Sequence, residues 1–140
     1  MSSLTYHNYD GYGKYAHDVF QYSQAVRIGD RIEISGQGGW DPKSAPPVLK
    51  PDVEHQIDQT FKNIDLTLKT AGGKGLSQVY SIRTYQPNLS KTPETFEILV
   101  KKVAEYFPDH KPIWTALGVE SLAMPEMLIE IEAVAYDPKE

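Results

Sequence analysis

Two amphipathic helical segments alternate with strand-like segments, and this alternation constrains the fold more than any other feature of the chain. Apolar residues recur at helical spacing over 52–71 and again over 92–107, and strand-like runs flank both segments. A chain of 140 residues is about the size of one ordinary domain. We therefore expect a single α+β domain over 1–140, in the order β-β-α-β-α-β-β, with both helices on one face of the sheet.

The N-terminal part of the chain falls into an aromatic segment and a hairpin. Residues 1–20 show neither helical nor strand period, and we interpret them as an ordered aromatic lead-in. From Tyr22 to Ser35 apolar residues alternate with other residues around Gly29-Asp30, a pair suited to a tight turn. This pattern predicts two antiparallel strands.

Helix start and stop signals place the remaining elements. Asp52 can cap the first helix, which Gly72-Gly73 ends, and Thr92-Pro93-Glu94 is a favourable start for the second. Further strands are expected over 78–85, 114–119 and 127–136. The strand over 78–85 should run parallel to an earlier one, because a helix separates them.

Composition limits the partners that we expect. The formal net charge is −5 and the longest basic run is Lys101-Lys102, so nucleic acid is an unfavourable partner. There are no cysteines, and the four histidines do not stand at metal-ligand spacing. No segment approaches the length that spans a bilayer. We expect a cytoplasmic protein that binds neither a membrane, a metal nor a cofactor.

Glu130 and Glu132 interrupt the apolar strand over 127–136. Being two residues apart, they share one face of that strand. A solvated sheet face explains them, and so does a cleft in which a buried carboxylate has a raised pKa and moves a proton. Because this face mixes glutamates with apolar residues and no third layer is encoded to cover it, we expect it to pack against another subunit.

Several stretches resemble the RidA family, small trimeric proteins known as deaminases of reactive enamines and imines. The resemblance extends over about 21–136. Its strongest pieces are Tyr22-Ser23-Gln24-Ala25-Val26, Ser35-Gly36-Gln37, Ala71-Gly72 and Ile129-Glu130-Ile131-Glu132-Ala133-Val134-Ala135. The resemblance implies a chorismate-mutase-like fold, a homotrimer whose sheets form a central barrel, and small-molecule clefts between subunits.

The resemblance also implies roles for individual residues. It matches Tyr22, Ser35 and Gly36 to the residues that frame the family's cleft, and Glu130 to the glutamate that positions the attacking water. The arginine that grips the substrate carboxylate does not carry over, because Trp114 stands at its place. An indole cannot form the bidentate pair of a guanidinium, but it can stack on an apolar ligand or attract a cation.

Two other residues complete the expected site. Arg83 is either a substitute cation in the cleft or an ion-pair partner at the subunit interface. Backbone groups near Ala116 are expected to bind the charge that develops during the reaction.

Three functions fit this set of residues. The first is hydrolysis of an imine or enamine whose ligand lacks a carboxylate, with Glu130 ordering the water. The second is a lyase, isomerase or cyclase step on a specialised metabolite, with Glu130 as general acid or base. In the third, the trimer has a metabolite-binding or chaperone-like role without chemistry, and its ligand stacks on Trp114. Alternatively, Trp114 fills the cleft and leaves the trimer as a scaffold. A ribonuclease function has little physical support in an acidic chain without clustered basic residues.

Overall fold

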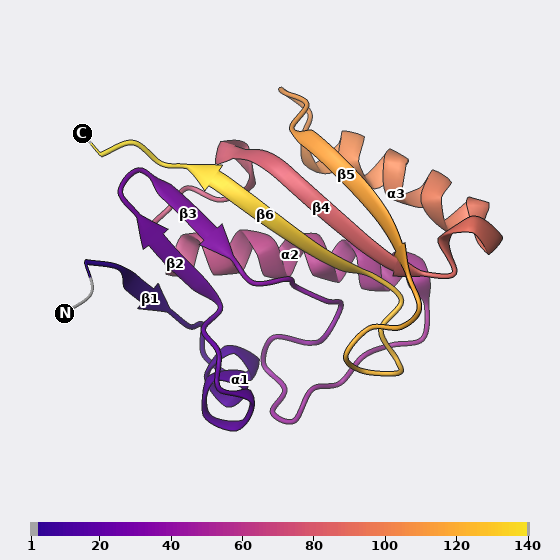
Figure 1. Ribbon diagram of the computed structural model, residues 1–140, viewed down its shortest axis with the longest axis horizontal. Helices are drawn as coiled ribbons and strands as arrows, with labels where there is room; N and C mark the ends of the chain where they lie inside the picture. Colours follow the sequence, from indigo (N-terminus) through magenta and orange to yellow (C-terminus); the bar gives the residue numbers. More distant parts are fainter. Residues whose placement is uncertain (1–2, 140) are drawn as a thin grey trace.

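The computed structural model describes residues 3–139, and within them six strands form one mixed sheet in the order β1-β2-β3-β6-β4-β5 (Figure 1). The strands are β1 (Thr5–His7), β2 (Ala25–Ile28), β3 (Arg31–Ile34), β4 (Val79–Pro87), β5 (Ile113–Val119) and β6 (Glu130–Tyr136). The helices are α1 (Tyr12–Phe20), α2 (Val53–Thr70) and α3 (Pro93–Tyr106), with short 3-10 turns at Leu76–Gln78 and Leu89–Lys91. The α+β class and the interleaving of strands with two long helices are confirmed.

The last strand of the chain lies in the middle of the sheet. β6 pairs antiparallel with β3 on one side and with β4 on the other, and β5 pairs parallel with β4 (Figure 1). β3 and β4 therefore run in the same direction, as a helical crossover predicts. The two strands are not neighbours, however, because β6 separates them.

α2 forms the centre of the core. The Asp52 carboxylate accepts a hydrogen bond from the backbone N–H of His55 at 2.8 Å, which caps the helix as predicted. The side chains of Ile57, Phe61 and Leu68 are fully buried against the sheet. Burying each such side chain is worth roughly 1.5–3 kcal/mol, so this stripe holds the helix on its face of the sheet.

α3 covers the same face beside α2 (Figure 1). Its start is as predicted, but the Thr92 hydroxyl donates to the carbonyl of Asn88 at 2.9 Å and does not cap the helix. Leu99 is fully buried, whereas Val100 is 45% exposed, so the buried face of α3 is narrower than its apolar pattern suggests.

β1 and α1 lie within the segment interpreted as an aromatic lead-in, and neither element was predicted from the sequence. β1 pairs with β2 at the edge of the sheet, and α1 lies beyond the ends of β2 and β3 (Figure 1). On α1, Tyr12 and Ala16 are buried, one helical turn apart, against Trp40 of the long loop before α2. Two buried residues one turn apart do not repeat often enough for a helix to be recognised in the sequence.

The face of the sheet away from α2 and α3 is not covered by any element in residues 3–139, and we call it the open face. It carries Glu130, Glu132 and alternate residues of the neighbouring strands. Large apolar side chains exposed on it include Tyr6 (56%), Ile113 (70%), Leu117 (39%) and Tyr136 (54%). None of the helices in residues 3–139 is long and apolar enough to cross a membrane.

Candidate functional site

A cavity of about 540 Å³ lies where α1 and the ends of β3 and β6 meet, and we call it the carboxylate cavity. Its lining residues are Tyr12, Phe20, Tyr22, Ser35, Gly36, Trp40, Ala123, Met124, Met127, Glu130 and Glu132. Four of the sequence-predicted residues, Tyr22, Ser35, Gly36 and Glu130, therefore line one cavity. Its volume is within the usual range for small-molecule sites.

Glu130 is the partly buried carboxylate of this cavity. Burial raises the pKa of its carboxyl above the ordinary value, and the nearby charge of Glu132 raises that pKa further. Among the described residues, none of the side chains that line the cavity is a lysine, arginine or histidine that would offset this charge. A carboxyl of this kind can take and return a proton closer to neutral pH than an exposed glutamate can.

Gly36 is the residue that lets Glu130 occupy this place. A Cβ atom at residue 36 would overlap the Glu130 carboxyl group, so the carboxyl lies directly against the backbone where β3 ends. The following residue, Gln37, exchanges two backbone hydrogen bonds with Ile131, at 2.9 and 3.0 Å. This bridge holds the strand exit against β6 and fixes Gly36 beside Glu130.

Glu132 joins the carboxylate cavity to a second hollow on the open face. The Tyr85 hydroxyl donates a hydrogen bond to Glu132, and this bond raises the pKa of Tyr85. Arg83 lies opposite Glu132 across β4 and β6, and both residues line a hollow of about 320 Å³ with Glu33. Arg83 thus shares the open face with Glu130 but does not line the carboxylate cavity.

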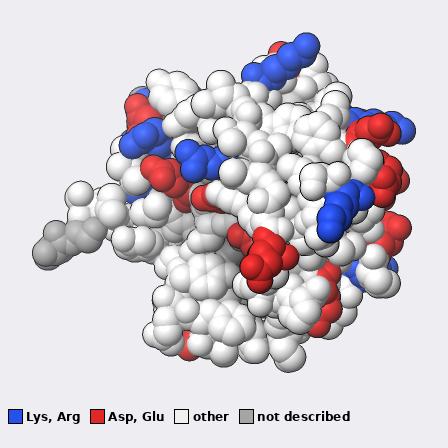
Figure 2. Space-filling view, turned by 45° about the vertical axis from the view of Figure 1, so that its right-hand side comes forward, with Lys and Arg blue, Asp and Glu red and all other residues white. Residues whose placement is uncertain are grey.

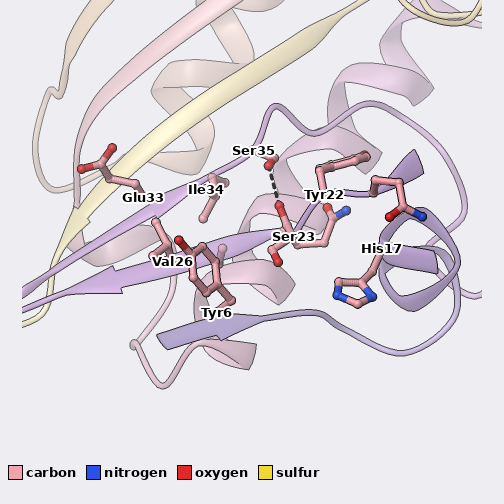
Figure 3. Close-up of a pocket in the computed structure, with 11 residues that line it drawn as sticks. Tyr6, His17, Tyr22, Ser23, Val26, Glu33, Ile34 and Ser35 are labelled. Carbon is pink, nitrogen blue, oxygen red and sulfur yellow. Dashed lines mark hydrogen bonds between the residues drawn. The ribbon is translucent and has the colours of Figure 1, made fainter. Parts of the chain in front are cut away.

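Tyr22 and Ser35 separate the carboxylate cavity from a third, more polar hollow of about 570 Å³, which we call the N-terminal hollow. Figure 3 shows Tyr6 and His17 around it and a hydrogen bond from Ser35 to the carbonyl of Ser23, at 2.7 Å. Because the Ser35 hydroxyl donates to the backbone, its oxygen is left to accept a hydrogen bond from a ligand.

A buried hydrogen-bond network supports the aromatic wall of the carboxylate cavity. Tyr9 donates to the Gln37 side chain at 2.9 Å and accepts from the Trp40 indole at 3.0 Å. The Tyr12 ring lies on Trp40 with 4.2 Å between ring centroids. Burial raises the pKa of both Tyr9 and Tyr12, so this wall is uncharged at neutral pH.

Trp114 and Ala116 lie on the opposite side of the sheet from Glu130. The Trp114 indole donates to the Thr84 hydroxyl at 3.0 Å and stacks on Phe96 of α3, with 5.5 Å between ring centroids. Ala116, two residues along β5, lines a shallow groove with Phe96. One chain alone therefore does not bring Trp114 or Ala116 to Glu130, and their joint cleft stays a prediction that needs a second subunit.

Apart from Tyr22, the aromatic and thioether side chains of the cavity were not predicted as site residues from the sequence. Tyr12 and Phe20 were assigned to the lead-in, and Trp40 to an irregular loop. Met124 lies between the last two expected strands, and Met127 was assigned to the start of the strand over 127–136. Their only signal is that aromatic and methionine side chains stand near the ends of strands, which is too general to identify a site.

The surface carries side chains of both charges (Figure 2), whereas the charged side chains that line the carboxylate cavity are both acids. On the face in Figure 2, lysine and arginine side chains are separated from one another, and several lie beside aspartate or glutamate. No group of three or more histidine, aspartate and glutamate side chains within residues 3–139 is placed to hold a metal ion.

Comparison with known proteins gives the family. The model described as endoribonuclease L-PSP matches residues 16–137. A RutC family protein of Pyrococcus horikoshii is 36% identical over 82% of this chain and 86% of its own length. A protein of Dermatophagoides farinae named 2-iminobutanoate/2-iminopropanoate deaminase is 26% identical over 81% of this chain and 83% of its own.

A solved structure agrees with this assignment. RidA from the Antarctic bacterium Psychrobacter sp. superposes with a TM-score of 0.73 at 31% identity, over 84% of this chain and 89% of that one. The matched region includes the four predicted residues that line the carboxylate cavity. The chain belongs to the RidA family, whose sequence model carries the description endoribonuclease L-PSP.

Proposed function

We propose that the protein is a divergent imine or enamine hydrolase that releases ammonia, with Glu130 as its catalytic residue. The observation that carries this proposal is a half-buried carboxyl of raised pKa, set against Gly36 in a mostly apolar cavity that Tyr22 and Ser35 also line. A relative named as an imine deaminase supports the reaction class.

The reaction needs one group that first removes and then returns a proton. A water molecule adds to the carbon of the C=N bond while the Glu130 carboxylate takes one of its protons, and the electron pair of the double bond moves to nitrogen. The protonated Glu130 then gives that proton to the nitrogen of the carbinolamine. Glu130 next takes the proton of the carbinolamine hydroxyl and passes it to the same nitrogen. The C–N bond breaks as that oxygen becomes a carbonyl, so ammonia leaves with both hydrogens of the water.

The cavity favours this use of Glu130 over simple solvation. A carboxyl whose pKa lies above the ordinary glutamate value is a stronger base when ionised and remains an effective acid near neutral pH. The aromatic wall of Tyr12 and Trp40 limits the number of competing water molecules.

We further propose that the protein acts as a homotrimer with the open face buried between subunits. Exposed Tyr6, Ile113 and Tyr136 on that face support this arrangement. In such an assembly the edge strand β5 of one chain, which carries Trp114 and Ala116, would approach the carboxylate cavity of another. Backbone groups at Ala116 would then bind the developing charge, and Trp114 would replace the carboxylate-binding arginine by an apolar surface.

The test compares two imines that differ only in a carboxylate. Freshly generated 2-iminobutanoate and propan-1-imine are followed by ammonia release with and without protein. We expect the protein to accelerate release from propan-1-imine at least about ten-fold more than release from 2-iminobutanoate, because no arginine among the described residues lines the carboxylate cavity to bind the acid. Faster turnover of 2-iminobutanoate would overturn the role assigned to Trp114, and acceleration of neither would overturn the hydrolase function.

A further inference from the structure

The walls of the carboxylate cavity consist of aromatic rings, methionines and two acids. Four aromatic side chains line it, from Tyr12, Phe20, Tyr22 and Trp40, together with Met124 and Met127. Glu130 and Glu132 are the ionisable acids of the lining, and no lysine, arginine or histidine among the described residues lines it. This composition suits a ligand with a positive charge and an apolar body.

An anionic ligand would meet repulsion in this cavity. Two carboxyl groups two residues apart on β6 face the same space, and burial strengthens the interaction of charges there. Their mutual effect is already visible, because the charge of Glu132 raises the pKa of Glu130. A cation placed between them would relieve that repulsion, whereas a second anion would increase it.

The open face also carries Arg83, which lies outside the carboxylate cavity. Arg83 lines the hollow that Glu132 and Glu33 share, and it lies directly across the strands from Glu132. Lining that hollow and not the carboxylate cavity, Arg83 does not replace the family's carboxylate-binding arginine within this chain.

Building on the proposed function, we infer that the carboxylate cavity selects a cationic nitrogen carried on an aromatic body, so that the substrate is the iminium ion of an arylalkyl amine. The nitrogen lies toward Glu130 and Glu132, and the ring packs against Phe20 and Tyr22, the lining aromatic side chains that are not fully buried. Hydrolysis converts this iminium ion and water to an arylalkyl aldehyde and an ammonium ion, which leaves the net charge unchanged. The positive charge also makes the C=N carbon more electrophilic, so that water attacks it more readily.

Truncation of Phe20 tests the packing of the ligand's ring, independently of charge. Phe20 ends α1 at the mouth of the cavity and is 50% exposed, so it can be truncated without opening the core. The preceding residue, Val19, is equally exposed at 52% and does not line the cavity, which makes it a matched control.

The experiment measures binding of three ligands of similar shape and different charge by calorimetry. They are 2-phenylethylamine (a cation), 2-phenylethanol (neutral) and phenylacetate (an anion). We expect the amine to bind about ten-fold more tightly than the alcohol and phenylacetate to bind most weakly, from the energies of cation–π contacts and of charges near a protein surface.

Four substitutions separate the contributions of charge and of the aromatic ring to binding. Glu132→Gln should remove most of the advantage of the amine over the alcohol, whereas Glu33→Gln, which removes an acid from outside the cavity, should leave that advantage unchanged. Phe20→Ala should weaken all three ligands about three- to ten-fold, and Val19→Ala should weaken none.

Failure of this inference and failure of the hydrolase function give different results. Phenylacetate binding as tightly as 2-phenylethylamine, or no binding of either, overturns the inference whatever the imine assay shows. Preferential binding of the amine that Glu132→Gln abolishes supports the inference. If the amine then binds but no imine is hydrolysed faster, the hydrolase function fails while the charge preference of the cavity stands.

Discussion

The carboxyl group of Glu130 lies against the backbone of Gly36, so closely that a Cβ atom at residue 36 would occupy its place. One residue is at the centre of the cavity and the other is where β3 ends, in a distant part of the sequence. The position of the carboxyl that we assign to catalysis thus depends on the absence of a side chain at residue 36.

Replacement of Gly36 by alanine should reduce activity without much loss of stability. The atoms that the new methyl group would meet belong to the outer part of the Glu130 side chain, which can rotate away. We expect ammonia release from imines to fall about a hundred-fold, in the range for loss of a positioned acid–base group. Urea denaturation should show a change of at most about 1 kcal/mol, a small overpacking cost.

Gly29→Ala is a control that should lose stability and keep activity. Gly29 has open space around it but a φ of +58°, in the left-handed region that alanine adopts unfavourably. This substitution should cost about 1 kcal/mol of stability and leave imine hydrolysis unchanged. Equal loss of activity in both variants would mean that Gly36→Ala acts through general destabilisation and not through Glu130.

Glu130 should make the wild-type protein less stable at neutral pH than a glutamine variant. The folded-state pKa of this carboxyl is raised by burial and by Glu132, so its contribution to stability is present below the ordinary glutamate pKa. That contribution is lost as the pH rises through the raised value. Glu130→Gln lacks this dependence, and denaturation midpoints measured from pH 4 to pH 8 should show it gaining stability over wild type as the pH rises.

The control for this measurement is Glu33→Gln. The Glu33 side chain is 43% exposed on the open face, so its replacement removes the same charge from a more solvated position. The change should be smaller than that for Glu130. A Glu130→Gln variant that is less stable than wild type at pH 7 would show that the surroundings stabilise the charged carboxyl, which is incompatible with a raised pKa.

Tyr9→Phe should destabilise the fold through the wall of the cavity. The lost hydroxyl leaves the Trp40 indole N–H and the amide oxygen of Gln37 each without its buried hydrogen-bond partner. We expect a loss of about 2 kcal/mol in the free energy of unfolding, measured with urea. Tyr15→Phe keeps the ring contacts with Tyr12 and Phe20 and should have no measurable effect. Equal effects of the two substitutions would argue against the network.

The order of the main elements could be predicted because each one repeats its pattern over several turns or alternations. Ile57, Phe61, Ile64 and Leu68 recur at helical spacing and are all fully buried on α2. α1 could not be predicted, because its buried face consists of Tyr12, Gly13 and Ala16 only. Its stability comes from contact with Trp40, a residue of the distant loop before α2.

The neighbours of each strand were harder to predict than the strands. A helix between β3 and β4 implies that they run in the same direction, which holds, but not that they are adjacent. β6 lies between them because its buried residues, such as Ile131 and Ala133, fill the centre of the core. Such pairing depends on contacts between distant segments, which local periodicity does not encode.

The residues of the candidate site also differ in how far the sequence could predict their positions. Tyr22, Ser35, Gly36 and Glu130 were found through motifs shared with a family, and all four line the carboxylate cavity. The face on which Trp114 lies was not predictable from its position in a motif. Its register with Ile82 on β4 places it on the helix side, where it stacks on Phe96.

The most direct test of the catalytic role of Glu130 is the kcat/KM for imine hydrolysis of Glu130→Gln beside wild type and Glu33→Gln. Glutamine preserves the shape of the side chain but cannot take a proton from water. We predict that Glu130→Gln loses about a hundred- to a thousand-fold in kcat/KM while Glu33→Gln stays within about two-fold of wild type. Retention of wild-type kcat/KM by Glu130→Gln would contradict that role.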